Sequence, residues 1–342
     1  MNASPARGSN APHHWSSRGL AACALLPVSG LFAGLSALRR GLYRAGWLRR
    51  EGVAVPVVVV GNIAVGGSGK TPVVAWLVEA LVDAGFRPGI VSRGYGGTES
   101  GPALVSSAAD PARFGDEPVL LARMTGRPLA IGRDRPAAAR ALLARHPECD
   151  VIVADDGLQH YRLARDVEIV VVDEAVLGNR WLLPAGPLRE SVARLARADV
   201  VIAHGELSAQ VRNAVGRTPL FSMKLTGDVL ESIDGTQRRP LADFRGQRVH
   251  AVAGIGRPQR FFDRLGEGGL DVVEHAFPDH HVYIPEDLAF APGEPKILTA
   301  KDAVKCAAFA PPETWVLPVR ATIDAAASQC IVEKLAHGSP PA

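Results

Sequence analysis

The feature that most constrains this chain is a glycine-rich loop between an apolar strand and a helix. Residues 55–62 read VPVVVVGN, a β-branched run typical of a strand buried on both faces of a parallel sheet. The segment AVGGSGKT at residues 64–71 matches the phosphate-loop pattern G-x-x-x-x-G-K-[ST], except that Ala64 replaces the first glycine. A helical pattern follows to residue 85. This order predicts a P-loop nucleotide site, and a chance GKT in a glycine turn is the weaker interpretation.

The residues of this loop are candidate nucleotide ligands: Ala64, Val65, Gly66, Gly67, Ser68, Gly69, Lys70 and Thr71. The glycines allow a tight turn whose N–H groups point at phosphate oxygens, and the helix N-terminus adds a favourable partial charge. In such loops the lysine reaches the β- and γ-phosphates and the hydroxyl residue binds Mg²⁺. The sequence therefore predicts ATP and Mg²⁺ as cofactors.

A second acidic site supports this interpretation. Residues 151–156 read VIVADD, an apolar strand that ends in Asp155 and Asp156, as a Walker B element does. Carboxylates at the carboxyl end of a parallel strand lie at the ligand-binding edge of the sheet. We expect Thr71, Glu117, Asp155 and Asp156 to be the metal candidates; the alternative for the two aspartates is a solvated turn.

Strands continue to alternate with helices along the chain, which predicts βαβ crossovers. The expected strands of the first domain lie at 87–94, 127–132, 144–157, 167–174 and 198–205, and those of a second unit at 249–256, 270–277, 295–305 and 314–323. The predicted fold class is α/β: a P-loop NTPase-type, mostly parallel sheet domain with a second, smaller α/β domain. We expect a disordered tail at 1–17, an N-terminal helix with a basic flank at 18–50, the P-loop domain at 51–222 and the smaller domain at 223–342.

The N-terminal segment from Gly19 to Leu38 carries no charge, and an arginine cluster follows it. A cleaved signal peptide is the weakest interpretation because that cluster opposes export. A helix of this length would span about 30 Å, but Pro27 and two glycines make it a poor membrane span. The third interpretation is an interfacial helix, with an apolar stripe of Ala24, Val28, Leu31, Leu35 and Leu38. Spanning and interfacial attachment both remain open, and both keep the rest of the chain in the cytoplasm; a buried helix of a soluble domain is the weaker alternative.

Ordered motifs along most of the chain resemble those of the tetraacyldisaccharide 4'-kinase family, the lipid A 4'-kinases. Besides the phosphate loop they are SRGYGG (92–97), GDEP (115–118), ADDGLQH (154–160), LLPAGPLRE (182–190), AGIGRPQRFF (253–262), FPDHH (277–281) and TAKDAVK (299–305). The resemblance implies transfer of the γ-phosphoryl group of ATP to the 4'-hydroxyl of a tetraacylated glucosamine disaccharide 1-phosphate. It also implies attachment to the cytoplasmic face of the inner membrane through the N-terminal helix.

The resemblance assigns roles to single residues. Asp116 is the candidate acid/base and His280 its partner from the second domain; capping of a helix is the alternative for Asp116, and the FPDH core favours His280 over His281. The candidate substrate-binding residues are Tyr95, Arg133, His160, Arg189 and Glu190, with Arg93 as a further phosphate clamp.

Two other classes of protein use the same loop. A nucleotide-driven switch or metallochaperone should carry a base-reading motif or a His- or Cys-rich tract. Residues 299–302 read TAKD, which has the wrong order for the guanine-reading motif, and no metal-binding tract is present. A scaffold with an inactive nucleotide site is disfavoured by the intact Gly69, Lys70 and Thr71. Neither a nucleic-acid partner, given a net charge of only +3, nor a protein partner is predicted.

Overall fold

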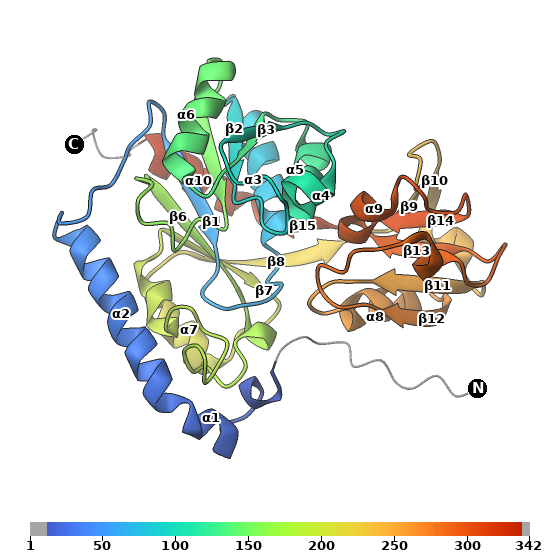
Figure 1. Cartoon of the computed structure of the whole chain (residues 1–342), viewed down its shortest axis with the longest axis horizontal. Helices are drawn as coiled ribbons and strands as arrows, with labels where there is room; N and C mark the ends of the chain where they lie inside the picture. Colours follow the sequence, from blue (N-terminus) through green and yellow to red (C-terminus); the bar gives the residue numbers. More distant parts are fainter. Residues whose placement is uncertain (1–11, 337–342) are drawn as a thin grey trace.

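The computed structural model describes residues 12–336, which form two α/β domains beside each other (Figure 1). The first domain contains a nine-stranded sheet in the order β15-β8-β7-β6-β1-β5-β2-β4-β3, parallel except for the two edge strands. Its strands are β1 (Val57–Gly61), β2 (Pro88–Ser92), β3 (Ala103–Val105), β4 (Leu129–Ile131), β5 (Val151–Asp155), β6 (Val167–Asp173), β7 (Val200–His204), β8 (Leu220–Thr226) and β15 (Arg320–Ile323).

Helices cover both faces of this sheet because alternate residues of its central strands point to opposite sides. Val58 and Val60 of β1 pack in one core with helices α3, α5 and α10, whereas Val57 and Val59 pack toward α6, and α7 covers β6 and β7. The helices of this domain are α3 (Lys70–Asp83), α4 (Pro111–Phe114), α5 (Asp116–Thr125), α6 (Arg135–Arg145), α7 (Ala209–Val215) and α10 (Ala325–Ala336), with 3₁₀ turns η2 (Glu174–Val176) and η3 (Val192–Arg197). The continuous apolar strands predicted from the sequence therefore correspond to a sheet buried on both faces.

The second domain contains a six-stranded sheet in the order β10-β9-β14-β13-β11-β12. Its strands are β9 (Val229–Ser232), β10 (Arg238–Pro240), β11 (Arg248–Ala253), β12 (Asp271–Ala276), β13 (Lys296–Thr299) and β14 (Thr314–Leu317); its helices are α8 (Gln259–Glu267), α9 (Ala300–Cys306), η4 (Leu241–Phe244) and η5 (Pro285–Leu288). The four strands from β14 to β12 pair in parallel, so their carboxyl ends share one edge. That edge faces the first domain.

The domain boundary differs from the one expected from the sequence. Residue 222 lies inside β8, and the apolar run 314–323 is two strands that belong to different sheets. Pro318 interrupts the run, β14 pairs with β13 of the second domain, and β15 pairs antiparallel with β8 of the first. The chain therefore returns to the first domain after residue 319, and α10 packs against α3 there. A single apolar stretch does not reveal that its two halves bury in different cores.

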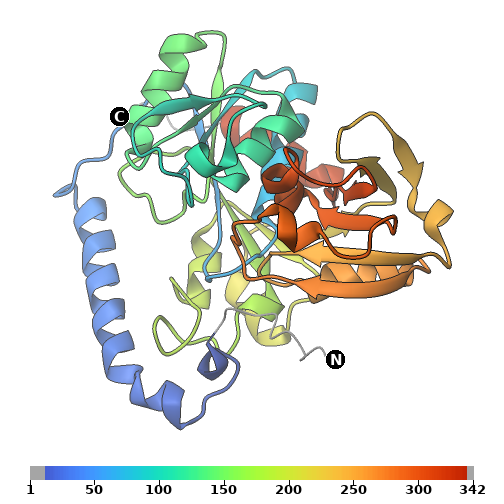
Figure 2. The same cartoon turned by 45° about the vertical axis from the view of Figure 1, so that its right-hand side comes forward.

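The N-terminal segment forms η1 (His13–Trp15), α1 (Leu20–Ala24) and α2 (Leu26–Arg44). The helix breaks at Leu25 because Pro27 lacks an N–H donor and occupies the first turn of a new helix. α2 runs along the edge of the first domain that lies away from the second domain in both views (Figures 1 and 2). Within residues 12–336 no helix is long and apolar enough to cross a membrane.

Part of the expected disordered tail is ordered. Residues 1–11 lie outside the described part of the chain, but residues 12–17 dock on the loop that follows η2. The Asn179 side chain donates hydrogen bonds to the carbonyls of His14 and Ser17, and the Trp15 indole donates to the carbonyl of Pro184 at 3.0 Å. These backbone partners come from 160 or more positions away, so a scan of local composition does not detect them.

The returning C-terminal segment gives a first prediction. Ile331 of α10 is fully buried in the core of the first domain. Replacing it in Ile331→Ala should lower the free energy of unfolding by about 2–5 kcal/mol because a cavity is left under α3. Hydrogen exchange should accelerate in α3 and β8. Gln329→Ala, at an exposed position of the same helix, should change stability by less than about 0.5 kcal/mol. Acceleration confined to β11 and β13 would contradict this assignment of α10.

Candidate active site

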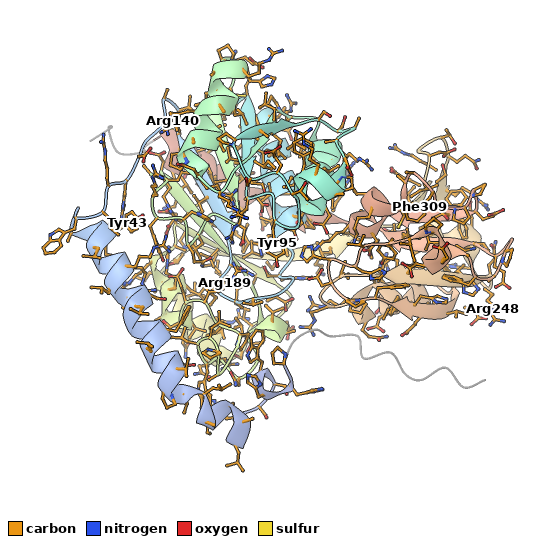
Figure 3. All side chains as sticks on the ribbon, in the orientation of Figure 1. Tyr43, Tyr95, Arg140, Arg189, Arg248 and Phe309 are labelled. Atoms are coloured by element: carbon orange, nitrogen blue, oxygen red, sulfur yellow. The ribbon has the colours of Figure 1, made fainter. Side chains whose placement is uncertain are left out.

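The carboxyl ends of strands from both sheets enclose one cavity of about 730 Å³ between the domains. Most of the expected site residues line it: Val65, Gly66, Gly67, Ser68, Gly69, Lys70, Thr71, Arg93, Tyr95, Glu117, Asp155, Asp156, Arg189 and His280. Tyr95 lies on the side of the first domain that faces the second (Figure 3). The second domain reaches the phosphate loop directly, since a Cβ built on Gly256 would lie 3.5 Å from the Gly67 nitrogen.

The phosphate loop has the conformation that its glycines suggest. Gly69 precedes α3 with a left-handed φ of +84°, and Gly66 has a φ of +117°, so a side chain at either position would strain the backbone. The side-chain amide of Asn62 donates to Ser68 Oγ at 3.1 Å and holds the loop closed from below. Ala64 is buried and pairs with Leu188 instead of lining the cavity. An alanine is therefore accommodated where the pattern has its first glycine.

The two aspartates after β5 have opposite electrostatic environments. Asp156 has a left-handed φ of +47° and lies 3.5 Å from Lys70 Nζ and 3.3 Å from Arg189 Nη1. Burial would raise its pKa, but these two cations outweigh burial and lower it to about 2. Asp155 is fully buried, and burial together with the negative charges of Glu117 and Asp156 raises its pKa to about 6. Only Asp156 is therefore well neutralised by neighbouring cations.

The expected pair of Asp116 and His280 meets across the cleft. Asp116 is the first residue of α5, His280 lies in the loop after β12, and Asp116 Oδ2 is 3.1 Å from His280 Nδ1. Burial would raise the pKa of Asp116, but the hydrogen bond from His280 and the charge of Lys301 lower it. The hydrogen bond to Asp116 raises the pKa of His280 against the effect of burial. The neighbouring His281 instead contacts Asp287 at 2.8 Å.

Three expected substrate-binding residues do not line the cavity. Arg133 is exposed on the loop before α6. Glu190 is buried, accepts a hydrogen bond from Gln159 at 3.0 Å, and forms ion pairs with Arg40 of α2 and Arg194. His160 is half-buried; burial and two nearby arginines lower its pKa to about 4, so its ring is neutral at pH 7. The PLRE motif thus divides between Arg189, which faces the cavity, and Glu190, which faces α2.

Three further charged groups at the site were not among the sequence candidates. The side chain of Arg135 is buried behind Asp155, donates to its carbonyl at 2.9 Å and leaves two nitrogens without a partner. Asp173, at the end of β6, binds Arg260 of α8 at 3.1 Å across the domain interface. Lys301 of α9 lies beside the pair Asp116–His280. Two sequence signals could have found them: Asp173 ends an apolar strand, and Lys301 lies in the TAKDAVK motif.

The carboxylates at the end of β5 and the start of α5 suit a divalent cation. Asp155 is a buried carboxylate whose side-chain donor is the Ser92 hydroxyl at 3.0 Å, and the charge of Glu117 acts on it. Among residues 12–336 no group of three or more His, Cys, Asp or Glu side chains could enclose a metal ion. This donor set suits Mg²⁺, which commonly uses one or two carboxylates together with phosphate oxygens and water.

Comparison with known proteins gives one consistent result. The tetraacyldisaccharide-1-P 4'-kinase family profile matches residues 21–336. The chain is 63% identical over 333 residues to a tetraacyldisaccharide 4'-kinase of Aromatoleum aromaticum, covering 97% of this chain and 99% of that protein. It is 60% identical to one of Azoarcus sp., covering 98% and 99%. The crystal structure of LpxK from Aquifex aeolicus in complex with ATP superposes with a TM-score of 0.79 at 30% identity, over 92% of this chain and 100% of that one.

The pKa values of two buried aspartates, Asp155 and Asp173, shift in opposite directions and predict opposite effects on stability. The pKa of Asp155, raised to about 6, means that ionisation destabilises the metal-free fold as the pH rises from about 4 to 6. Asp155→Asn should therefore be more stable than the parent at pH 7, by roughly 1–3 kcal/mol, in thermal unfolding with a chelator present.

Asp173 provides the matched control. Hydrogen bonds from His204 and Arg260 outweigh burial and lower its pKa, so its ionised form stabilises the fold above about pH 4 and that contribution is lost as the pH falls. Asp173→Asn should lose roughly 1–3 kcal/mol at pH 7. Stability changes of the same sign in both variants would contradict this assignment of charges.

Proposed function

This chain belongs to the tetraacyldisaccharide 4'-kinase family. We propose that it transfers the γ-phosphoryl group of ATP to the 4'-hydroxyl of a tetraacylated glucosamine disaccharide 1-phosphate, and that the transfer takes place in the interdomain cavity. The chain is a lipid A 4'-kinase, and the product is the lipid IVA precursor. The observation that carries the proposed mechanism is the contact of the buried Asp116 with His280, which lines the same cavity as the phosphate loop. The family assignment does not favour a nucleotide-driven switch or a metallochaperone.

The phosphate loop binds the triphosphate in this proposal. Its glycine N–H groups and the N-terminus of α3 face the β-phosphate, and Lys70 stabilises the charge on the transferring group. Asp156 holds the lysine side chain before ATP arrives, since Lys70 Nζ lies 3.5 Å from it, and Arg189 holds Asp156 in turn. Support comes from the Aquifex aeolicus relative, whose structure is of a complex with ATP.

Mg²⁺ fits the same site. The residues that would hold it are Thr71, Asp155 and Glu117, with Asp156 as a further candidate. Asp156 has Lys70 and Arg189 as cationic partners and Glu117 has Lys301, whereas Asp155 is the least compensated. A bound Mg²⁺ would neutralise negative charge on the β- and γ-phosphates during transfer. Arg135 behind Asp155 holds the strand end in place through its hydrogen bond to the Asp155 carbonyl.

The pair Asp116–His280 orients the acceptor hydroxyl and receives its proton. Asp116 stays ionised at neutral pH because its neighbours lower its pKa, and His280 brings the pair to the surface of the cavity. The backbone of His280 has a left-handed φ of +61°, and the Tyr95 ring packs edge-on against the imidazole with 5.1 Å between the ring centroids. Both features restrict the imidazole to one orientation, as a positioning role in phosphoryl transfer requires.

In this proposal the disaccharide end of the lipid substrate enters the interdomain cavity. Arg93 and Arg189 are the phosphate clamps that line the cavity, and Tyr95 offers an exposed ring to the sugar. The burial of Glu190 and its ion pair with Arg40 assign it to holding α2 against the first domain. The backbone N–H of His160 donates to the Gly157 carbonyl and closes the turn after Asp156, and the exposed Arg133 has no assigned substrate contact.

Membrane attachment through α1 and α2 is part of the proposal. The side chains of Val28, Leu31, Leu35 and Leu38 are all more than half exposed on α2, and Leu20 of α1 is 91% exposed. Arginines follow the stripe and would meet anionic head groups. We therefore assign the helix to the plane of the interface, at the cytoplasmic face of the inner membrane, where the lipid substrate resides.

The direct test of the catalytic pair is phosphoryl transfer to the disaccharide 1-phosphate in detergent. Asp116→Asn and His280→Gln should each lower kcat by about 10²–10⁴-fold, while the Kd for ATP changes by less than about threefold. The double variant should be scarcely slower than the slower single variant because the two residues act as a unit. Losses that multiply would show that the two residues act independently, and absence of transfer by the parent chain would refute the function itself.

The interfacial helix is tested with anionic phospholipid vesicles. Leu31→Glu/Leu35→Glu should bind vesicles at least about tenfold more weakly than the parent, since each leucine removed from the lipid loses about 1.5–3 kcal/mol, and should still bind ATP. Leu104→Glu/Val229→Glu has the same charge change at exposed apolar positions of β3 and β9 and should bind vesicles normally. Complete release of the parent by high salt alone would show that the stripe is not inserted.

A further inference from the structure

The ammonium group of Lys301 lies beside the proposed catalytic pair Asp116–His280, and the mechanism above gives it no role. Its Nζ lies 3.1 Å from Asp279 Oδ1, 3.2 Å from Glu117 Oε1 and 3.8 Å from Asp116 Oδ2. It also lies 3.4 Å from His280 Nε2. The side chain is 15% exposed and lines the cavity. One cation from the second domain thus contacts both members of the catalytic pair and a second carboxylate of the first domain.

The local structure around Lys301 explains the TAKD motif without nucleotide recognition. Thr299 Oγ1 caps α9 by accepting from the Asp302 nitrogen, and Asp302 is fully buried and accepts from the Gly254 nitrogen at 2.9 Å. The threonine and the aspartate therefore build the end of β13 and the start of α9. Lys301 lies in the first turn of that helix, where a positive charge is opposed by the helix dipole. A cation at this unfavourable position requires compensation, and the carboxylates across the cleft supply it.

The charges in the cleft show what the ammonium group does. Asp116 and Glu117 belong to the first domain and Asp279 to the second, so closing the cleft brings like charges toward one another. An ammonium group between them converts this repulsion into attraction. A lysine ammonium is a donor only, so His280 Nε2 accepts from it and Nδ1 is left to donate to Asp116. The same contact thus joins the domains and orders the hydrogen bonds of the pair.

We propose that Lys301 is a positioning residue of the phosphoryl-transfer reaction, which assembles Asp116 and His280 into a working pair by bridging the carboxylates of the two domains and donating to His280 Nε2. This inference rests on the kinase function proposed above. In this proposal α9 of the second domain contributes to catalysis as well as to the fold. The reaction itself is unchanged: the ammonium group forms and breaks no covalent bond.

A simpler role for Lys301 would be to hold the domains together, and the chain contains a matched comparison. Arg260 of α8 also crosses the interface, where it binds the buried Asp173 at 2.5 and 3.1 Å. It belongs to the same domain as Lys301 and lines the same cavity. Its contacts are with Asp173 and His204, at the ends of β6 and β7, and involve neither Asp116 nor His280. A pure closure role predicts the same kinetic effect from removing either cation.

The experiment compares Lys301→Met with Arg260→Met in the full chain, with ATP and the disaccharide 1-phosphate in detergent. Lys301→Met should lower kcat by about 10²-fold, a loss typical of a preorganised charged group, with KM for ATP within about threefold. Arg260→Met should chiefly raise KM for ATP and lower kcat by less than about tenfold. Lys301→Arg keeps the charge and should retain more activity than Lys301→Met.

A chemical rescue separates the ammonium group from a role in folding. In Lys301→Ala, ethylammonium should restore part of kcat with saturation, whereas tetramethylammonium at the same ionic strength should not, because it has no N–H donor. Circular dichroism and ATP binding check that each variant is folded; if Lys301→Met does not fold, the arginine and amine-rescued variants still decide the question.

Three outcomes would overturn the inference: kcat of Lys301→Met within about threefold of the parent, the same rise in KM for both variants, or equal rescue by both amines. Failure of the parent chain to phosphorylate the disaccharide would refute the proposed function instead, so the two failures are distinguishable.

Discussion

The candidate active site depends on two mostly parallel sheets whose parallel strands have their carboxyl ends at one cleft. In a parallel sheet, the loops that follow the strands all begin at the same edge. In the first domain that edge carries the phosphate loop after β1 and the aspartate pair after β5. In the second it carries His280 after β12 and Lys301 after β13. The cleft is thus lined from both domains, and the chain leaves the first domain after β8 and returns to it with β15, which pairs with β8.

Charge in the cleft is balanced locally rather than as a net sum. Asp156 is neutralised by Lys70 and Arg189, and Asp173 by Arg260, whereas burial leaves Asp155 with a pKa of about 6. The carboxylates that meet across the interface are bridged by Lys301. A buried carboxylate without a cation is costly. Asp155, the least compensated of these carboxylates, therefore lies where the proposed mechanism requires a divalent cation. A bound cation would supply the positive charge that the protein does not.

The N-terminal helix is tied to the catalytic domain through polar contacts although its apolar stripe faces outward. The Ser29 hydroxyl donates to the Leu182 carbonyl at 2.8 Å, and Arg40 pairs with the buried Glu190. Arg189, the next residue in the chain, reaches Asp156 in the cavity. One short segment of the PLRE motif thus contacts both α2 and the nucleotide site. If α2 binds lipid as proposed, two adjacent residues, Glu190 and Arg189, would connect the lipid-bound helix to Asp156 in the cavity.

Local pattern determined much of this protein from sequence alone. The apolar run before AVGGSGKT and the run ending in Asp155 specify buried parallel strands, because only a covered sheet accepts them. The motifs GDEP and FPDHH pointed to the two residues that meet, but only folding shows that Asp116 and His280 lie 3.1 Å apart. The division of residues 314–323 between two sheets, the burial of Glu190 and the position of Lys301 were decided by tertiary structure alone. Each depends on which distant chain segment supplies the partner, and neither periodicity nor spacing encodes that choice.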